Sequence, residues 1–179
     1  MNKKYKLRMI ISGGQTGVDR AALDFALANH IQCSGWCPLN RRAEDGSIPL
    51  KYPLLEINSR FYPPRTRKNI KDSDATLIFA EETLKGGTQL TLDYANKINK
   101  PVLWVKKSEK NPSELLIKWL NKIKPEVLNV AGPRLSENSE LYTFTISVLT
   151  SSVFSDNDSK LVSWPPKRAT MKTFDDLKT

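Results

Sequence analysis

The stretch that decides the fold is Leu7-Arg8-Met9-Ile10-Ile11-Ser12-Gly13-Gly14-Gln15-Thr16-Gly17. Its first five residues form a short, mainly apolar run, which is typical of a buried strand, and the serine and glycines end that run. From Val18 to Asn29, alanine and phenylalanine side chains recur at helical spacing. The stretch therefore predicts a strand, a glycine-rich turn and a helix.

The same alternation continues along the chain. Further apolar runs, each a candidate strand, occur at 31–35, 75–80, 101–105 and 127–131. Helical spacing of apolar side chains predicts helices at 66–73, 90–99, 112–123 and 140–153. Residues 38–53 contain three prolines and a glycine, which interrupt helices and strands, so this segment is expected to be a long ordered loop. Because apolar strands need cover on both faces, we predict an α/β fold: an open parallel sheet with helices on both faces.

Length, composition and charge bound what the protein can be. The 179 residues fit one domain, expected at 1–154, whereas 155–179 is expected to be a tail that wraps the domain or a partner, or stays mobile. The 28 Lys and Arg against 19 Asp and Glu give a net charge of +9, which attracts anions without specifying which. With no secretory signal and no apolar run of membrane length, we expect a cytoplasmic protein without a membrane partner.

The cysteines and the single histidine argue against several kinds of chemistry. Cys33 and Cys37 are expected to be reduced thiols, and with His30 alone beside them they do not supply a four-ligand zinc site. We therefore expect no metal held by protein side chains. His30 ends a predicted helix, so a Ser-His-Asp arrangement lacks a base, and hydrolysis would need a carboxylate such as Asp19, Glu44 or Asp45.

Three glycine-containing turns follow predicted strands, at the edge where open parallel sheets bind ligands. They are 12–17, Gly86-Gly87-Thr88 before the helix near residue 90, and Gly132-Pro133-Arg134. Glycines let backbone amides approach an anion, and a helix N-terminus adds about half a positive charge. Each turn taken alone is equally consistent with an anion-binding site and with a plain turn, and Arg134 is equally consistent with an anion-binding residue and with a surface arginine. Together they predict one anion cradle, with the first two turns side by side if their strands are neighbours.

Several arginines near these turns are candidates for binding an anion. Arg41 and Arg42 are expected either to clamp an anionic ligand or to form ion pairs within a solvated turn. Arg20 lies in a first helical turn, where an anion would offset its unfavourable position. The basic stretch 60–71, with Phe61 and Tyr62, indicates a binder of single-stranded nucleic acid or a nucleotide, or else a solvated face.

A larger set of motifs resembles a known family. The motifs are 13–24, 35–38, 41–46, 52–54, Asn69, 72–76, Gly86-Gly87-Thr88, Thr91 and 128–134. This pattern covers about residues 8 to 150 and resembles the molybdenum carrier family, relatives of the molybdenum cofactor carrier proteins. The resemblance implies a Rossmann-like fold, shared with the Lonely-guy phosphoribohydrolases and the DNA-processing protein DprA. It also implies dimers or tetramers and a nucleotide-like or phosphorylated ligand.

The same resemblance assigns ligand-binding residues. It implies that Gly13, Gly14, Gln15, Thr16 and Gly17 line the ligand, with Gly86, Gly87, Thr88 and Thr91 on the second turn. Arg20, Arg41, Arg42 and Arg134 are the arginines expected to join them. The phosphoribohydrolase signature Pro-Gly-Gly-x-Gly-Thr-x-x-Glu is incomplete, because 85–93 lacks one glycine and the glutamate, for which Asp93 is the only nearby substitute.

The leading expectation is a binding or carrier protein for a phosphorylated pterin- or nucleotide-like small molecule. Molybdenum cofactor, a pterin with a phosphate, is the candidate that the resemblance names. One alternative is a hydrolase of the phosphoribohydrolase type that cleaves an N-glycosidic or phosphate bond of a nucleotide. The other is a nucleic-acid-binding protein that uses residues 60–71.

Overall fold

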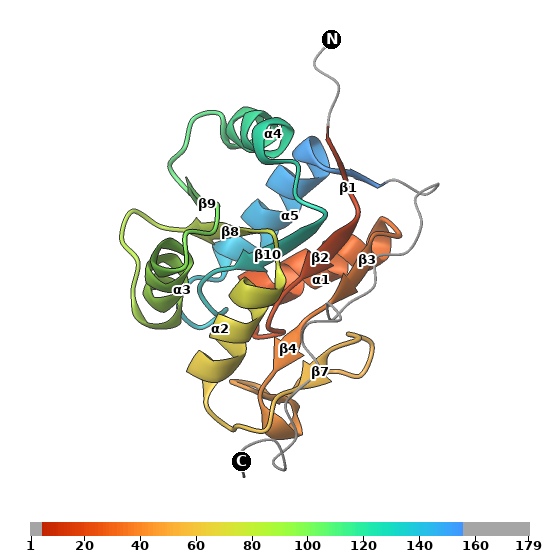
Figure 1. Cartoon of the computed structure of the whole chain (residues 1–179), viewed down its shortest axis with the longest axis vertical. Helices are drawn as coiled ribbons and strands as arrows, with labels where there is room; N and C mark the ends of the chain where they lie inside the picture. Colours follow the sequence, from red (N-terminus) through yellow and green to blue (C-terminus); the bar gives the residue numbers. More distant parts are fainter. Residues whose placement is uncertain (1–4, 156–179) are drawn as a thin grey trace, which may run out of the picture.

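The computed structural model describes residues 5–155, and its centre is a five-stranded sheet (Figure 1). All neighbouring strands of this sheet run parallel. Their order is β3 (Gln32–Ser34), β2 (Met9–Ile11), β10 (Val127–Ala131), β8 (Ala75–Ala80) and β9 (Val102–Lys106). Each lies within or next to a predicted apolar run, so the open parallel sheet is confirmed.

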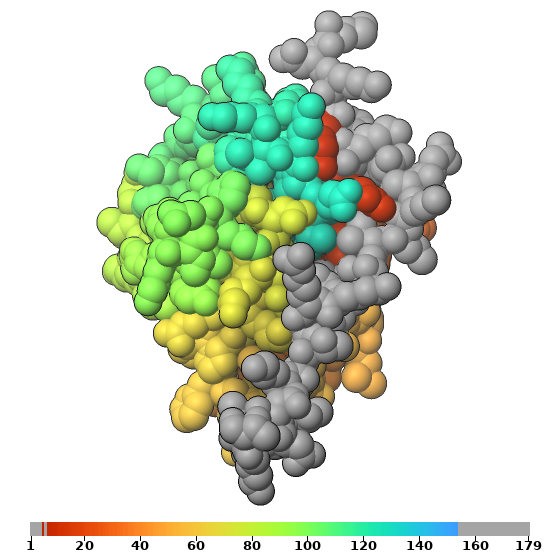
Figure 2. Space-filling model, in the orientation of Figure 1, coloured from red at the N-terminus to blue at the C-terminus, as the bar shows by residue number. Residues whose placement is uncertain are grey.

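Helices cover both faces of the sheet, as predicted. On one face α1 (Val18–Ala28) packs against α5 (Glu140–Ser152), and α4 (Pro112–Ile123) packs against α5 and β9. On the other face α2 (Tyr62–Asp72) packs against α3 (Gly86–Lys97), in yellow and green in Figures 1 and 2. The fold is therefore α/β and Rossmann-like.

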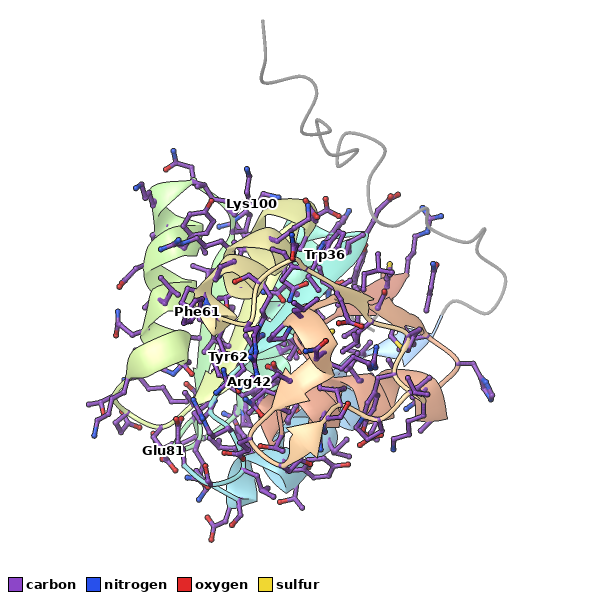
Figure 3. All side chains as sticks on the ribbon, turned by 90° about the horizontal axis from the view of Figure 1, so that it is seen from below. Trp36, Arg42, Phe61, Tyr62, Glu81 and Lys100 are labelled. Atoms are coloured by element: carbon purple, nitrogen blue, oxygen red, sulfur yellow. The ribbon has the colours of Figure 1, made fainter. Side chains whose placement is uncertain are left out.

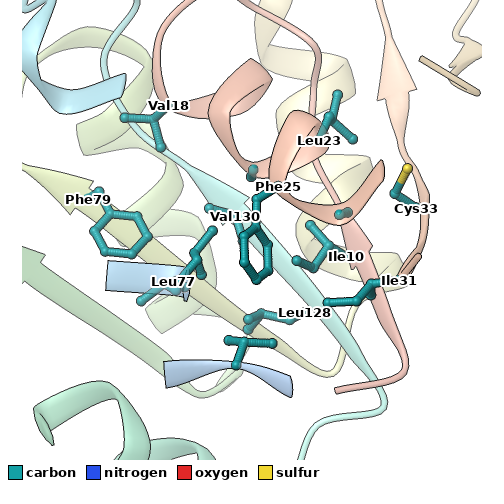
Figure 4. Close-up of a cluster of buried hydrophobic side chains, with 14 of the residues drawn as sticks. Ile10, Val18, Leu23, Phe25, Ile31, Cys33, Leu77, Phe79, Leu128 and Val130 are labelled. Carbon is teal, nitrogen blue, oxygen red and sulfur yellow. The ribbon is translucent and has the colours of Figure 1, made fainter. Parts of the chain in front are cut away.

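The core lies between the sheet and the α1–α5 layer (Figure 4). All six residues of β8 are buried, and the Phe79 and Phe144 rings meet edge to face with centroids 5.9 Å apart. Burying each large apolar side chain stabilises the fold by about 1.5–3 kcal/mol. Continuous apolar strands are thus explained by burial on both faces rather than on one.

Two helices begin earlier than the sequence pattern predicts. Helix α2 starts at Tyr62 instead of residue 66, with Pro63 in its first turn, where a missing N–H costs no helical hydrogen bond. Helix α3 starts at Gly86 instead of residue 90. Apolar periodicity detects only the buried part of a helix, so first turns made of proline or glycine are missed.

The segment expected as a long loop is ordered and contains short elements. It holds a 3₁₀ turn, Leu39–Arg41, and a hairpin of β5 (Arg42–Ala43) with β6 (Gly46–Ser47). Two short parallel pairs were also not predicted: β4 (Trp36–Cys37) with β7 (Leu55–Glu56), and β1 (Lys6–Leu7) with β11 (Phe154–Ser155). The expected boundary at 154 stays a prediction, since 156–179 lies outside the described residues.

The strand order places a crevice at one edge of the sheet. Strand β10 lies between β2 and β8, so the first and second glycine turns do not follow neighbouring strands. Helix α1 leaves β2 on one face, whereas α3 leaves β8 on the other. Connections that diverge in this way open a crevice beyond the carboxyl ends of the strands, here next to the end of β10.

Candidate functional site

A cavity of about 290 Å³ lies in this crevice. Its walls come from the turn after β2, the start of α1, the first turns of α2 and α3, and the end of β10 with the turn that follows it. The lining residues are Gln15, Asp19, Tyr62, Pro63, Arg65, Thr66, Gly86, Gly87, Thr88, Leu90, Thr91, Ala131, Gly132, Arg134 and Glu137. The first and second glycine turns thus meet at one cavity although β10 separates their strands.

A buried ion pair forms one wall of the cavity. Arg65 Nη1 lies 3.1 Å from Asp19 Oδ2, and the two side chains are 12% and 3% exposed. Burial raises the pKa of Asp19, while Arg65 and the amide of Gln15, which donates to Oδ2, act in the opposite direction. A Cβ at Gly13 would lie 1.5 Å from Arg65 Nη1, so the glycine makes room for this guanidinium.

Three guanidinium groups surround the Tyr62 ring at this cavity. The Cζ atoms of Arg42, Arg65 and Arg134 lie 5.5, 5.9 and 5.8 Å from the ring centroid. They come from the β5–β6 hairpin, α2 and the turn after β10, and Figure 3 shows Arg42 next to Tyr62. Such cation–π contacts hold the cations in place. Arg65 is paired with Asp19 and Arg134 with Glu137, at 3.1 and 3.2 Å.

The N-terminus of α3 forms another wall. The N-cap, Lys85, makes no side-chain capping hydrogen bond, and within residues 5–155 the amides of Gly86 and Gly87 have no acceptor. Apart from the neighbouring residues in the chain and the backbone of α3 itself, no atom lies within 4 Å of a Cβ placed on either glycine. Because both glycines line the cavity, two free donors and the positive end of the helix dipole lie at its wall.

The structure brings six of the sequence-predicted ligand residues together and leaves the other seven outside the cavity. Those that line it are Gln15, Gly86, Gly87, Thr88, Thr91 and Arg134. Those that do not are Gly13, Gly14, Thr16, Gly17, Arg20, Arg41 and Arg42. Arg42 nevertheless contacts the lining residue Tyr62.

The first turn is packed against protein rather than open. Thr16 donates its hydroxyl to Glu44 and accepts from the amide of Leu135 at 3.1 Å, and the Thr16 amide donates to Gln15 Oε1. Burial favours a higher pKa for Glu44, but hydrogen bonds from Ser136 and Thr16 outweigh it and lower that pKa. These contacts tie the first turn to the β5–β6 hairpin and to the turn after β10.

Two of the predicted arginines have protein partners. Arg20 makes a two-pronged contact with Asp45, at 2.5 and 2.8 Å, so a carboxylate offsets its place in the first turn of α1. Arg41 donates to the carbonyl oxygens of 48, 49, 52 and 54 at 2.9–3.2 Å. As ligand residues these two stay predictions, and the structure gives both a role in holding segment 38–54.

The sequence analysis did not include Asp19, Tyr62 or Arg65 among the predicted ligand-binding residues. Asp19 was named only as a carboxylate that hydrolysis could use, and the other two belong to the basic stretch 60–71. The available signal was Pro63-Pro64, which starts α2 and places Tyr62 and Arg65 in its first turns. In the same stretch, Lys68 pairs with Asp72 at 3.2 Å and Arg67 lies over the Tyr94 ring, away from the cavity.

The described residues offer no evident place for a metal and no membrane span. Between residues 5 and 155, no group of three or more His, Cys, Asp and Glu side chains could hold an ion. Burial raises the pKa of the Cys33 thiol to about 11, so the thiolate that metals bind is scarce at neutral pH. None of the helices in this range is long and apolar enough to cross a membrane.

Comparison with known proteins identifies the family. The model of the circularly permutated YpsA SLOG family matches residues 10–153. The chain belongs to this family. A crystal structure of a "Putative molybdenum carrier protein" from Syntrophus aciditrophicus SB is 43% identical, with a TM-score of 0.81, over 84% of this chain and 98% of that one. No curated protein matches the chain. These two matches confirm the resemblance to the molybdenum carrier family that the sequence motifs indicate.

Proposed function

We propose that the chain is a binding or carrier protein for a phosphorylated pterin- or nucleotide-like small molecule. The observation that carries the proposal is the set of three guanidinium groups around Tyr62, beside a cavity whose other wall is the N-terminus of α3. Molybdenum cofactor is the candidate cargo, because it combines a pterin with a phosphate and because the relative from S. aciditrophicus carries the name of a molybdenum carrier.

The arginines have donors to spare for an anion. Arg42 forms no ion pair within residues 5–155, and its one hydrogen bond, to the Arg60 carbonyl, is 3.4 Å long. Arg65 Nε also lacks an acceptor in the same part of the chain, but protein encloses it, so it is not a donor that faces the cavity. Arg65 is paired with Asp19 and Arg134 with Glu137, so Arg42 is the one of the three without a carboxylate within residues 5–155, and a phosphate would accept its free donors.

The amides of Gly86 and Gly87 supply the second half of the cradle. A helix N-terminus favours an anion by about 0.3–1 kcal/mol, and more where the site is partly buried. Because both glycines lack side chains and face open space, a phosphate oxygen can reach their N–H groups. Binding then depends on backbone amides and arginines and needs no protein-bound metal.

The two alternatives have less support from the site. Asp93, the candidate catalytic carboxylate of a phosphoribohydrolase, accepts from Gln89 at 2.7 Å on the outer side of α3 and does not line the cavity. Arg65, one of the cations of the proposed nucleic-acid surface, instead faces a cavity sized for a small molecule. A dimer or tetramer remains part of the proposal.

The test compares an arginine that lines the cavity with one that does not. Ribose 5-phosphate serves as the probe, and at a hundred times its Kd it should raise the free energy of unfolding by about 2.7 kcal/mol. Arg134→Gln should remove most of this gain, whereas Arg67→Gln should keep it. Equal losses in both variants, or no gain in the unmodified protein, would refute the proposal.

Native mass spectrometry of freshly purified protein provides an independent measurement. It weighs any small molecule that the protein retains and counts subunits in the same spectrum. A retained phosphorylated compound that is recovered unchanged after incubation supports a carrier. Its conversion into cleavage products identifies an enzyme instead.

A further inference from the structure

A second cavity of about 370 Å³ adjoins the first. It lies on the other side of the α3 N-terminus, and the two cavities share Thr88 and Glu137. Its lining residues are Glu81, Thr83, Leu84, Lys85, Thr88, Pro133, Glu137 and Asn138. Binding sites for small molecules usually measure about 300–1,000 Å³, so the adjoining pair suits one ligand larger than a phosphate group.

The two cavities differ in what they offer a ligand. The first presents the guanidinium groups of Arg65 and Arg134 and the free amides of Gly86 and Gly87, and its carboxylates, Asp19 and Glu137, are each paired with one of these arginines. The second presents two carboxylates, Glu81 and Glu137, together with Lys85. One oxygen of Glu81 accepts from the Asn138 amide, and one of Glu137 lies 3.2 Å from Arg134 Nε. Within residues 5–155 the other oxygen of each carboxylate has no partner, so each can accept an N–H from a ligand.

Thr88 lies where the two cavities meet. Its side chain is nearly buried, with the residue 5% exposed, yet its hydroxyl makes no hydrogen bond to any other residue of 5–155. The neighbouring Thr91 hydroxyl, by contrast, donates to the Gly87 carbonyl at 2.8 Å. The Thr88 hydroxyl is not one of the enclosed side-chain atoms without a partner, so it is open to the cavities. A ligand atom that spans the junction can therefore form a hydrogen bond with it.

We infer that one ligand occupies both cavities and that the second cavity binds its heterocyclic ring through N–H donors. This inference rests on the proposed function, which places the phosphate in the first cavity. The ring edge that fits a carboxylate carries a ring N–H beside an exocyclic amino group. Guanine and pterin share this edge, whereas adenine presents an acceptor next to its amino group. A site that accepts two N–H bonds discriminates strongly against a ring that lacks one of them.

The experiment measures binding of GMP, IMP, AMP and ribose 5-phosphate by titration calorimetry. The four probes share a sugar phosphate, and IMP differs from GMP only in lacking the exocyclic amino group. We expect GMP to bind at least tenfold more tightly than IMP or AMP. Glu81→Gln should bring the affinity for GMP down to that for IMP and leave ribose 5-phosphate binding unchanged.

Glu82→Gln is the matched control. Glu82 is adjacent in sequence but pairs with Lys106 at 3.0 Å and does not line the second cavity. It should preserve the preference for GMP. Equal affinities for GMP, IMP and AMP, with ribose 5-phosphate still bound, would overturn this inference and leave the proposed function standing. So would an equal effect of Glu81→Gln on all four probes. If none of the probes binds, the proposed function fails and this inference fails with it.

Discussion

The two glycine turns look alike in sequence and differ in what surrounds them. In the first, a Cβ on Gly14 would lie 2.4 Å from Leu54 Cδ1, and one on Gly17 would lie 2.6 Å from the Pro133 carbonyl oxygen. In the second, no atom outside the local backbone lies within 4 Å of that position on Gly86 or Gly87. The first turn is glycine-rich because protein occupies the space, and the second leaves its space open at a cavity.

This difference separates two uses of glycine after a strand. At the first turn, close packing brings segments 41–54 and 132–136 together and allows Arg65 to reach Asp19. At the second, the missing side chains expose backbone donors. The proposed cradle therefore depends on the first turn indirectly, through the shape of the cavity, and on the second turn directly.

The largest effect should come from Gly17→Ala. Gly17 has φ 77° and ψ −129°, a conformation that only glycine adopts readily, and the added methyl would meet the backbone of Pro133 and Leu135. We expect the free energy of unfolding to fall by about 3 kcal/mol or more, measured by urea denaturation. A loss below about 1 kcal/mol would show that the first turn is not packed as described.

The sequence predicted more of the fold than of the site. Apolar runs such as 75–80 determine the parallel sheet because burial on both faces leaves few other arrangements. Site residues depend on side-chain contacts that no local pattern records. Arg65 reaches the cavity because Gly13, far away in sequence, lacks a side chain, and Arg41 is occupied by carbonyl groups of its own segment. The glycine turns were found from sequence, but which of them is open depends on what packs against each.

An intermediate effect on stability should come from Asp24→Asn, because Asp24 holds the segment that packs beside the first turn. Asp24 on α1 accepts hydrogen bonds from Lys51, Tyr52 and Tyr142, at 2.8–3.1 Å, which holds the segment whose Leu54 fills the space beside Gly14. Burial alone raises the pKa of Asp24, but these hydrogen bonds outweigh it and lower the pKa below 3.8. Asp24→Asn should therefore cost about 1–2 kcal/mol at pH 7.

The pH dependence follows from the direction of that shift. A carboxyl whose pKa is lowered on folding stabilises the protein above its unfolded pKa, near 3.8, and loses this contribution as the pH falls through the folded value. Urea denaturation at pH 7 and at pH 3 should show the gap between the unmodified protein and Asp24→Asn narrowing at the lower pH. A gap that stays constant would mean that the Asp24 charge does not carry the effect.

The smallest effect on stability should come from Gly87→Ala. Residue 87 lies in the first turn of α3, where alanine favours the helix relative to glycine, and the new methyl group meets no other atom. We expect the free energy of unfolding to stay the same or rise by up to about 0.5 kcal/mol. The stabilisation by ribose 5-phosphate should nevertheless fall, because the methyl group enters the space from which a phosphate would reach the amides. Urea denaturation with and without the probe measures both quantities on one variant. If ribose 5-phosphate stabilises Gly87→Ala as much as the unmodified protein, the second turn does not contact the bound phosphate. If Gly87→Ala loses much stability without the probe, this turn is packed against protein like the first.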